Sequence, residues 1–223
     1  MNYNELFSQV VRRSKASAIR ELLKVIARPD IISFAGGLPD PELFPTKDVS
    51  AIMQDVLEKS PKAALQYGTT EGFLALRQEL VKLLKETEGI TATPDQLVMV
   101  SASQQALDMT ARLFVNPGDP IITACPTYLG ALQAFHVAGA HIIGAASDDY
   151  GILAEDLEAK LARLKAAGKT CKFIYLVPDF QNPTGTTIPE ERRVKILEIA
   201  KKYHTFILED SPYRQVRFEG ESP

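Results

Sequence analysis

The second half of the chain alternates short apolar runs with longer amphipathic segments, and this alternation is what most constrains the fold. From Gln96 onward, runs typical of buried strands are followed by segments with helical periodicity. Strands that alternate with helices predict βαβ units and a parallel sheet. We therefore expect an α/β fold with a mostly parallel sheet and flanking helices. The expected strands cover residues 97–100, 121–124, 141–145, 172–177 and 205–209.

The helical segments show apolar positions on one side. Leu107, Ala111 and Phe114 share one side of the segment after residue 102. Residues 155–167 carry mixed charges on the outer face and are expected to cover the sheet. The remaining expected helices are 4–11, 46–60, 71–88 and one opened by Pro189, whose apolar face is Val194, Ile196, Leu197 and Ile199.

Polar side chains follow the last two expected strands. The strand at 172–177 runs into a loop rich in Pro and Gly that contains Asn182, and the strand at 205–209 is followed by Asp210 and Tyr213. In a parallel α/β sheet, ligands bind just beyond the carboxyl ends of the strands. We expect these three side chains to face one crevice.

Composition excludes several classes of function. With 223 residues, of which 45% are hydrophobic and 24% charged, the chain can bury a sizeable globular core. A net charge of -3 gives no electrostatic reason to expect nucleic acid or an anionic membrane as a partner. The two cysteines and three histidines lack metal-ligand spacing, so no metal is expected. No segment looks like a signal peptide or a membrane span, which predicts a cytoplasmic protein.

Several motifs together resemble one enzyme family. The loop Asn182–Gly185, followed by a strand that ends in Asp210-Ser211-Pro212-Tyr213, resembles the class I/II aminotransferases of fold type I, which depend on pyridoxal 5'-phosphate (PLP). The branch with 2-aminoadipate and kynurenine aminotransferases is the most similar. The segments that carry this finer resemblance are Met1-Asn2-Tyr3, Ile19-Arg20, residues 31–39 and Phe180-Gln181-Asn182.

The resemblance implies a cofactor site. It places Ser103 and Gln104 at the phosphate, at the start of a helix whose free amides and dipole favour an anion. It makes Tyr128 the aromatic platform for the pyridine ring, and it brings Asn182, Asp210 and Tyr213 to the polar atoms of that ring. Tyr67 is expected to reach the phosphate of the neighbouring subunit in a homodimer.

Each residue also has an ordinary structural interpretation. Ser103 suits a helix N-cap, Asn182 a turn and Asp210 a cap, while an isolated Tyr67 suits the edge of a core. Their joint occurrence at the family's spacing favours the site.

The resemblance also implies substrate contacts. Arg20 is expected on an N-terminal helix, where its guanidinium would make a bidentate contact to a distal carboxylate of the substrate. A solvated helix arginine is the alternative. Gly37 is expected against the bound amino acid, with a simple tight turn as the alternative, and Asn182 is expected to reach the substrate carboxylate.

Two positions depart from the family pattern. Ala102 stands where the family usually has glycine before Ser-Gln-Gln, so this turn must tolerate a Cβ. Cys125 stands near a position that is often acidic, and we expect it to be a structural cysteine on a buried turn.

The resemblance implies that residues 1–45 are an N-terminal arm contributing to the small domain and substrate site, and that residues 46–223 are the first part of the PLP-binding large domain. The lysine that holds PLP as a Schiff base and the arginine that binds the α-carboxylate are expected beyond Pro223. The 223-residue chain alone is therefore expected to be inactive.

The predicted function of the full-length protein is amino-group transfer from an amino acid, such as 2-aminoadipate or an aromatic amino acid, to 2-oxoglutarate. Amino acids and 2-oxo acids are thus its expected partners. The alternative is the aminotransferase-like effector domain of a GntR-type transcription regulator. Those regulators carry an N-terminal DNA-binding module, and no basic module of that kind precedes the enzyme-like start here.

Overall fold

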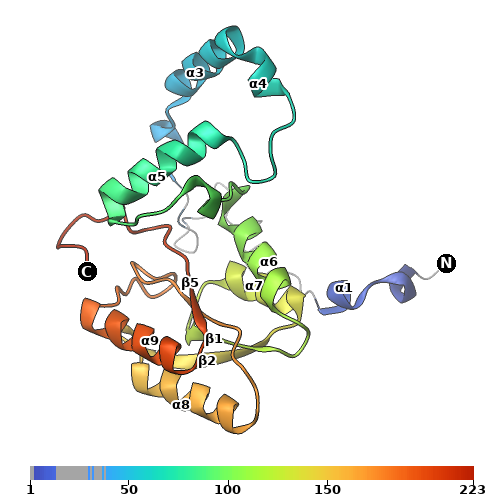
Figure 1. The fold of residues 1–223 in the computed structure, drawn as a ribbon, viewed down its shortest axis with the longest axis vertical. Coiled ribbons are helices and arrows are strands. Elements are labelled where there is room, and N and C mark those ends of the chain that lie inside the picture. The colour runs from blue at the N-terminus through green and yellow to red at the C-terminus, as the bar shows by residue number, and fades with distance from the viewer. Residues whose placement is uncertain (1–2, 14–29, 31, 33–36, 38) are drawn as a thin grey trace. The chain divides into compact units, whose positions relative to one another are not determined.

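The computed structural model describes residues 3–13, 30, 32, 37 and 39–223 (Figure 1). The chain forms two compact units. The first joins Met1–Lys15 to Ser101–Pro223, and the second is Ala16–Val100. The units are described separately below. The predicted division into residues 1–45 and 46–223 concerns the arrangement of a larger protein and stays a prediction.

A five-stranded sheet forms the centre of the first unit. The strands have the order β3-β2-β1-β4-β5. β1 pairs in parallel with β2 and β4, and β4 pairs in parallel with β5, whereas β2 and β3 are antiparallel. The prediction of a mostly parallel α/β sheet is therefore confirmed. The strands are β1 (Pro120–Cys125), β2 (His141–Asp148), β3 (Gly151–Ile152), β4 (Phe173–Leu176) and β5 (Phe206–Glu209).

Helices cover both faces of this sheet. α6 and α7 lie on one face, and α8 and α9 lie on the other (Figure 1). Crossovers of this kind are what parallel strands require, because each chain reversal must return over a face of the sheet. The helices are α6 (Ala102–Phe114), α7 (Leu129–Ala138), α8 (Ala154–Ala166) and α9 (Glu190–Lys202).

Two hydrophobic cores result, one on each face. Side chains alternate along β4 because successive Cβ atoms point to opposite faces. Phe173 and Tyr175 join the core under α6 and α7, whereas Ile174 and Leu176 join the core under α8 and α9. β4 is buried at all four positions. A strand buried on both faces reads as a continuous apolar run, which explains why it could be recognised in the sequence.

The predicted apolar face of α9 is partly wrong. Ile196 and Ile199 are buried, but Val194 is 48% exposed and Leu197 is 53% exposed. Ala200 completes the buried stripe. A residue with a small side chain thus takes a core position that the apolar pattern assigned to larger neighbours.

The second unit is helical where the structure describes it. α5 ends at Gly89, which adopts φ 67° as a left-handed C-cap. The helices of the second unit are η2 (Pro41–Leu43), α3 (Thr46–Lys59), α4 (Pro61–Leu65), α5 (Leu74–Glu88) and η3 (Pro94–Gln96). The predicted helices at 46–60 and 71–88 are confirmed, although α5 begins three residues later than predicted.

The strand predicted at residues 97–100 is wrong for the described part of the chain. Leu97 is extended, but residues 97–100 join no ladder in the described chain, and Val98 is 53% exposed. Met99 instead donates its backbone amide to the carbonyl of Glu71 at 2.9 Å. An apolar extended run becomes a strand only when a partner strand satisfies its backbone groups.

The helix predicted at residues 4–11 is divided in two. η1 covers Tyr3–Leu6 and α1 covers Gln9–Arg13.

Within the ranges that the structure describes, no helix is long and apolar enough to span a bilayer. The same residues contain no cluster of His, Cys, Asp or Glu that suits a metal ion.

Candidate functional site

Three neighbouring strands bring the predicted site residues to one edge of the sheet. β1, β4 and β5 lie side by side and parallel, so their carboxyl ends meet. Tyr128 follows β1, Asn182 follows β4, and Asp210 directly follows β5. All three side chains are half-buried. This edge is where ligands bind in open parallel sheets.

Asp210 is held by a tyrosine from the adjacent strand. The hydroxyl of Tyr175 on β4 donates to Oδ2 of Asp210 at 2.8 Å. The backbone amide of Asp210 also donates to the carbonyl of Leu176 at 2.9 Å, which continues the β4–β5 ladder by one step. Both the backbone and the carboxylate of Asp210 are therefore fixed relative to β4.

Tyr175 is a permanent donor in this pair. Its side chain is fully buried against Phe135, with ring centroids 5.3 Å apart. Burial, together with the neighbouring Asp210 carboxylate, raises the pKa of Tyr175 far above its usual range. The hydroxyl stays protonated at any physiological pH and keeps donating to Asp210.

Asn182 and Tyr213 approach each other from two different strand ends. Nδ2 of Asn182 lies 3.5 Å from the hydroxyl of Tyr213. Both groups can donate hydrogen bonds. Two converging donors make a site for one anionic oxygen.

The loop after β4 has a defined shape that positions Asn182. Its neighbour Gln181 is buried and donates from Nε2 to the carbonyl of Pro126 at 3.0 Å. Oε1 of Gln181 accepts from the Thr184 amide at 2.9 Å and from its hydroxyl at 2.6 Å. The loop is thereby closed on itself and tied to the segment after β1.

Tyr128 and Gln104 meet at Gly130, in the first turn of α7. Nε2 of Gln104 donates to the carbonyl of Gly130 at 3.1 Å. A Cβ on Gly130 would lie 2.5 Å from Cζ of Tyr128, so the absence of a side chain there leaves room for the ring. The start of α6 is thus connected to the aromatic ring after β1.

α6 begins with a residue in the left-handed region. Ala102 has φ 62°, a conformation that favours glycine. The turn therefore accommodates the Cβ of Ala102, as the sequence requires, but with a strained backbone. Ser103 lies inside the helix rather than at its N-cap, which is Ser101, so the N-cap interpretation of Ser103 is wrong. Ser103 and Gln104 are both exposed at the helix start, where amides and dipole favour an anion.

Three other predicted site residues belong to the second unit. Tyr67 is 98% exposed. A Cβ on Gly37 would meet nothing within 4 Å. Arg20 lies outside the described residues. Their roles stay predictions.

The expectation that Cys125 lies on a buried turn is wrong, because this cysteine is exposed at the end of β1. Cys171 is the buried cysteine of the pair. Burial raises the pKa of its thiol, which keeps it protonated and unreactive.

The sequence did not reveal two residues of this region. Tyr175 was read only as part of an apolar strand, although a tyrosine in such a run brings a hydroxyl that needs a partner. Asp179 is a fully buried carboxylate three residues after the end of β4, where the sequence pattern indicates only a loop. An acidic residue next to a buried run was the available signal, since buried charges need partners.

Comparison with solved structures identifies the class of protein. The chain superposes on kynurenine aminotransferase from Pyrococcus horikoshii with a TM-score of 0.91 and 44% identity, covering 99% of this chain and 54% of that one. That structure is described as a complex with PMP. The fold is therefore that of the fold type I PLP-dependent enzymes. The family profile for aminotransferase class I and II matches residues 30–222, and the chain belongs to that family, whose cofactor is PLP.

Curated relatives agree with this assignment. Aromatic-amino-acid aminotransferase 1 of Thermococcus litoralis is 45% identical over 221 residues, which cover 99% of this chain and 53% of the relative. The 2-aminoadipate transaminase of Thermus thermophilus is 36% identical over 218 residues, which cover 98% of this chain and 52% of the relative. The chain thus spans about half the length of the curated relatives it matches.

A more distant relative belongs to another functional class. The HTH-type transcriptional regulator YdcR of Escherichia coli is 25% identical over 205 residues, which cover 92% of this chain and 43% of the regulator.

Proposed function

We propose that the full-length protein transfers an amino group from an amino acid to a 2-oxo acid and that residues 102–213 supply one side of its PLP site. The observation that carries the proposal is that Asp210, held by Tyr175, and the hydrogen-bonded pair Asn182–Tyr213 all follow the carboxyl ends of the neighbouring strands β4 and β5. One anionic group and one pair of donors thus follow the same two strands.

The donor and acceptor set fits the cofactor. A carboxylate suits a protonated pyridine nitrogen, and two converging donors suit the anionic oxygen on the same ring. The half-buried ring of Tyr128 suits a flat heterocycle. The start of α6, with the Ser103 hydroxyl, suits a phosphate.

When bound, PLP supplies an electron-withdrawing ring that stabilises the negative charge left after an amino acid loses its α-proton. Asp210 would keep the ring nitrogen protonated by accepting its hydrogen bond, a charge-assisted contact of about 1.5–3 kcal/mol. Tyr175 keeps Asp210 in the orientation that this contact requires.

Asn182 and Tyr213 would donate to the ring oxygen and so disfavour its protonation. Tyr128 would hold one face of the ring, while Ser103 and Gln104 would bind the phosphate end. The lysine that removes and returns the α-proton is part of this proposal as a residue beyond Pro223.

We extend the proposal to substrates. The relatives are named for aromatic amino acids and 2-aminoadipate, so these are the candidate donors, with 2-oxoglutarate as the acceptor. Arg20 would bind a distal carboxylate, and Gly37 and Asn182 would contact the bound amino acid.

The proposal also includes an assembly. Residues 1–45 would be the N-terminal arm of the substrate site, and residues 46–223 the first part of the large domain. In a homodimer, Tyr67 would reach the partner's phosphate. The high exposure of Tyr67 is consistent with such a role.

A regulator domain is the second candidate, favoured by the similarity to YdcR. An aminotransferase and an effector domain would bind the same cofactor, but only the first turns over substrate. Amino-group transfer by the purified full-length protein therefore separates them.

The test compares Asp210→Asn with the wild-type full-length protein. We expect the variant to bind PLP but to lose most of its amino-group transfer, because an amide does not hold the ring nitrogen protonated. Asp119→Asn is the matched control, since Asp119 pairs with Lys172 at 3.3 Å at the amino-terminal end of β1. Wild-type turnover in Asp210→Asn would refute the role.

A further inference from the structure

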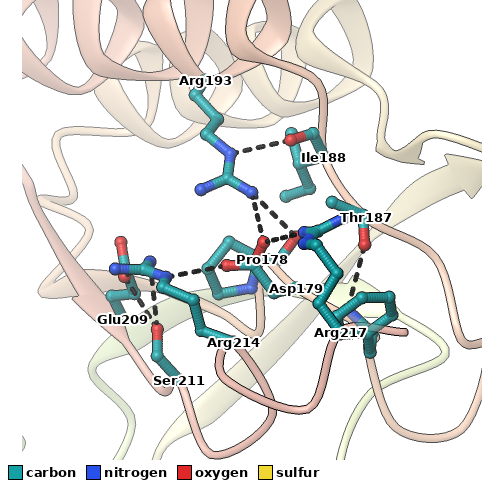
Figure 2. Close-up of polar contacts among 10 residues, drawn as sticks. Pro178, Asp179, Thr187, Ile188, Arg193, Glu209, Ser211, Arg214 and Arg217 are labelled. Atoms are coloured by element: carbon teal, nitrogen blue, oxygen red, sulfur yellow. Dashed lines mark hydrogen bonds and ion pairs between the residues drawn. The ribbon is translucent and has the colours of Figure 1, made fainter. Parts of the chain in front are cut away.

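Asp179 is a fully buried carboxylate that three arginines approach. Oδ1 accepts from Nη2 of Arg193 at 2.8 Å and lies 3.5 Å from Nη2 of Arg217. Oδ2 accepts from Nε of Arg214 at 3.1 Å. Figure 2 shows the three guanidinium groups converging on this side chain from different directions.

The Asp179 carboxylate is ionised in this cluster. Burial opposes the charge on Asp179, but the hydrogen bonds from Arg193 and Arg214 hold its pKa below the ordinary value. Arg214 also pairs with Glu209. Three positive charges therefore face two negative ones, and Asp179 is the negative charge that all three arginines share.

The three arginines come from two segments that differ in secondary structure. Arg193 lies on α9 and also donates to the carbonyl of Ile188 at 2.7 Å, which anchors the cluster to a helix. Arg214 and Arg217 lie beyond β5, in a segment without regular secondary structure. Its link to the rest of the unit therefore depends strongly on side-chain contacts.

The cluster joins the two segments that carry the donors of the proposed cofactor site. Asp179 precedes Asn182 by three residues, and Arg214 directly follows Tyr213. The ion pair between Asp179 and Arg214 thus joins the chain that carries Asn182 to the chain that carries Tyr213. The side chains of Asn182 and Tyr213, 3.5 Å apart, therefore lie on the two segments that this ion pair joins.

We propose that Asp179 is a positioning residue that, through Arg214 and Arg217, holds Tyr213 against Asn182 so that both donate to the same oxygen of the cofactor. This inference rests on the proposed function. Asp179 itself does not touch the cofactor in this account. It acts by fixing the segment after β5.

Replacing Asp179 with Asn tests the inference because the shape of the side chain is kept while the shared charge is lost. The three arginines would then repel one another, and residues 211–218 would loosen. Donors that stabilise an anionic oxygen lower its proton affinity. The pH midpoint of the visible absorption band of the bound cofactor should therefore rise, by about half a pH unit or more.

The experiment uses the full-length protein loaded with PLP and measures two quantities. The first is this pH midpoint, and the second is hydrogen exchange of residues 211–218, which include the Val216 amide bonded to the Tyr213 carbonyl at 2.9 Å. Asp148→Asn is the matched control, because Asp148 accepts two bonds from Arg192, at 2.5 and 3.0 Å, at the end of β2, which β1 separates from β4. Asp179→Asn should change both quantities and Asp148→Asn neither.

A second variant, Arg214→Met, removes the link but leaves Asp179 paired with Arg193, and it decides the matter if Asp179→Asn does not fold. Arg214→Met should also raise the pH midpoint of the visible absorption band. Faster exchange with an unchanged midpoint would overturn the inference, because the cluster would then be structural only. A wild-type protein that shows no visible band with PLP would contradict the proposed function instead, while the exchange measurement would still report whether Asp179 holds the segment.

Discussion

Tyr175 and Asp210 are joined by a 2.8 Å hydrogen bond that runs from the middle of the sheet to its carboxyl edge. The donor sits on a strand that is buried on both faces, so it cannot move without disturbing two cores. The bond engages Oδ2, and Oδ1 can accept a second donor. A carboxylate held in this way is prepared to bind one protonated nitrogen.

Removing this hydroxyl should weaken both the fold and the site. In Tyr175→Phe, Asp210 keeps its charge but loses a buried donor, so we expect the free energy of unfolding to fall by about 1–3 kcal/mol. PLP should bind less tightly to the full-length variant, as measured by titration of the cofactor's absorption. Tyr150→Phe is the control, because Tyr150 is 61% exposed. Equal PLP affinity in both variants would show that Tyr175 does not serve the site.

The alanine at the start of α6 predicts a stabilising substitution. Ala102→Gly removes the strain of φ 62° but adds the conformational entropy of glycine to the unfolded chain. The balance should raise the free energy of unfolding by about 0.5–1 kcal/mol, measured by urea denaturation. The same change at Ala106, inside α6, should cost about 1 kcal/mol. A loss of similar size at both positions would refute the strained geometry.

The buried carboxylate of Asp179 predicts a dependence of stability on pH. Its pKa is lowered below the ordinary value of 3.8, so its ionised form favours the folded state. This contribution is complete above that value and is lost as the pH falls through the lowered one. The difference in unfolding free energy between wild type and Asp179→Asn should therefore be large at neutral pH and shrink as the pH falls below 3.8. A difference that stays constant over this range would mean that Arg193, Arg214 and Arg217 do not stabilise the charge.

Arg20 predicts a change in substrate preference. If its guanidinium binds a distal carboxylate, Arg20→Ala should weaken kcat/KM for 2-aminoadipate by about 1–3 kcal/mol more than for phenylalanine. Steady-state kinetics of the full-length protein with both amino acids measure this difference. Equal losses would make Arg20 a structural residue.

The sequence predicted the sheet because its strands are short apolar runs between helical segments. The prediction failed at residues 97–100, where an apolar run is present but no partner strand lies within the described chain. It also failed at α9, where the small residue Ala200 occupies a core position that the apolar pattern assigned to larger residues. Local pattern carries no information about the partner that a segment will meet.

The candidate site could also be predicted in part from local sequence. Asn182, Asp210 and Tyr213 follow strand ends and match a known motif, so their location could be read directly. Tyr175 and Asp179 could not be recognised, because their roles depend on partners 35 residues away at Asp210 and Arg214. Only the folded chain brings these pairs together.

The most direct test of the account is a crystal structure of the full-length protein with PLP. We predict that the Asp210 carboxylate lies within about 3 Å of the pyridine nitrogen and that Asn182 and Tyr213 both donate to the ring oxygen, with Tyr128 against the ring face. A cofactor bound elsewhere, or a ring nitrogen without contact to Asp210, would contradict the central claim.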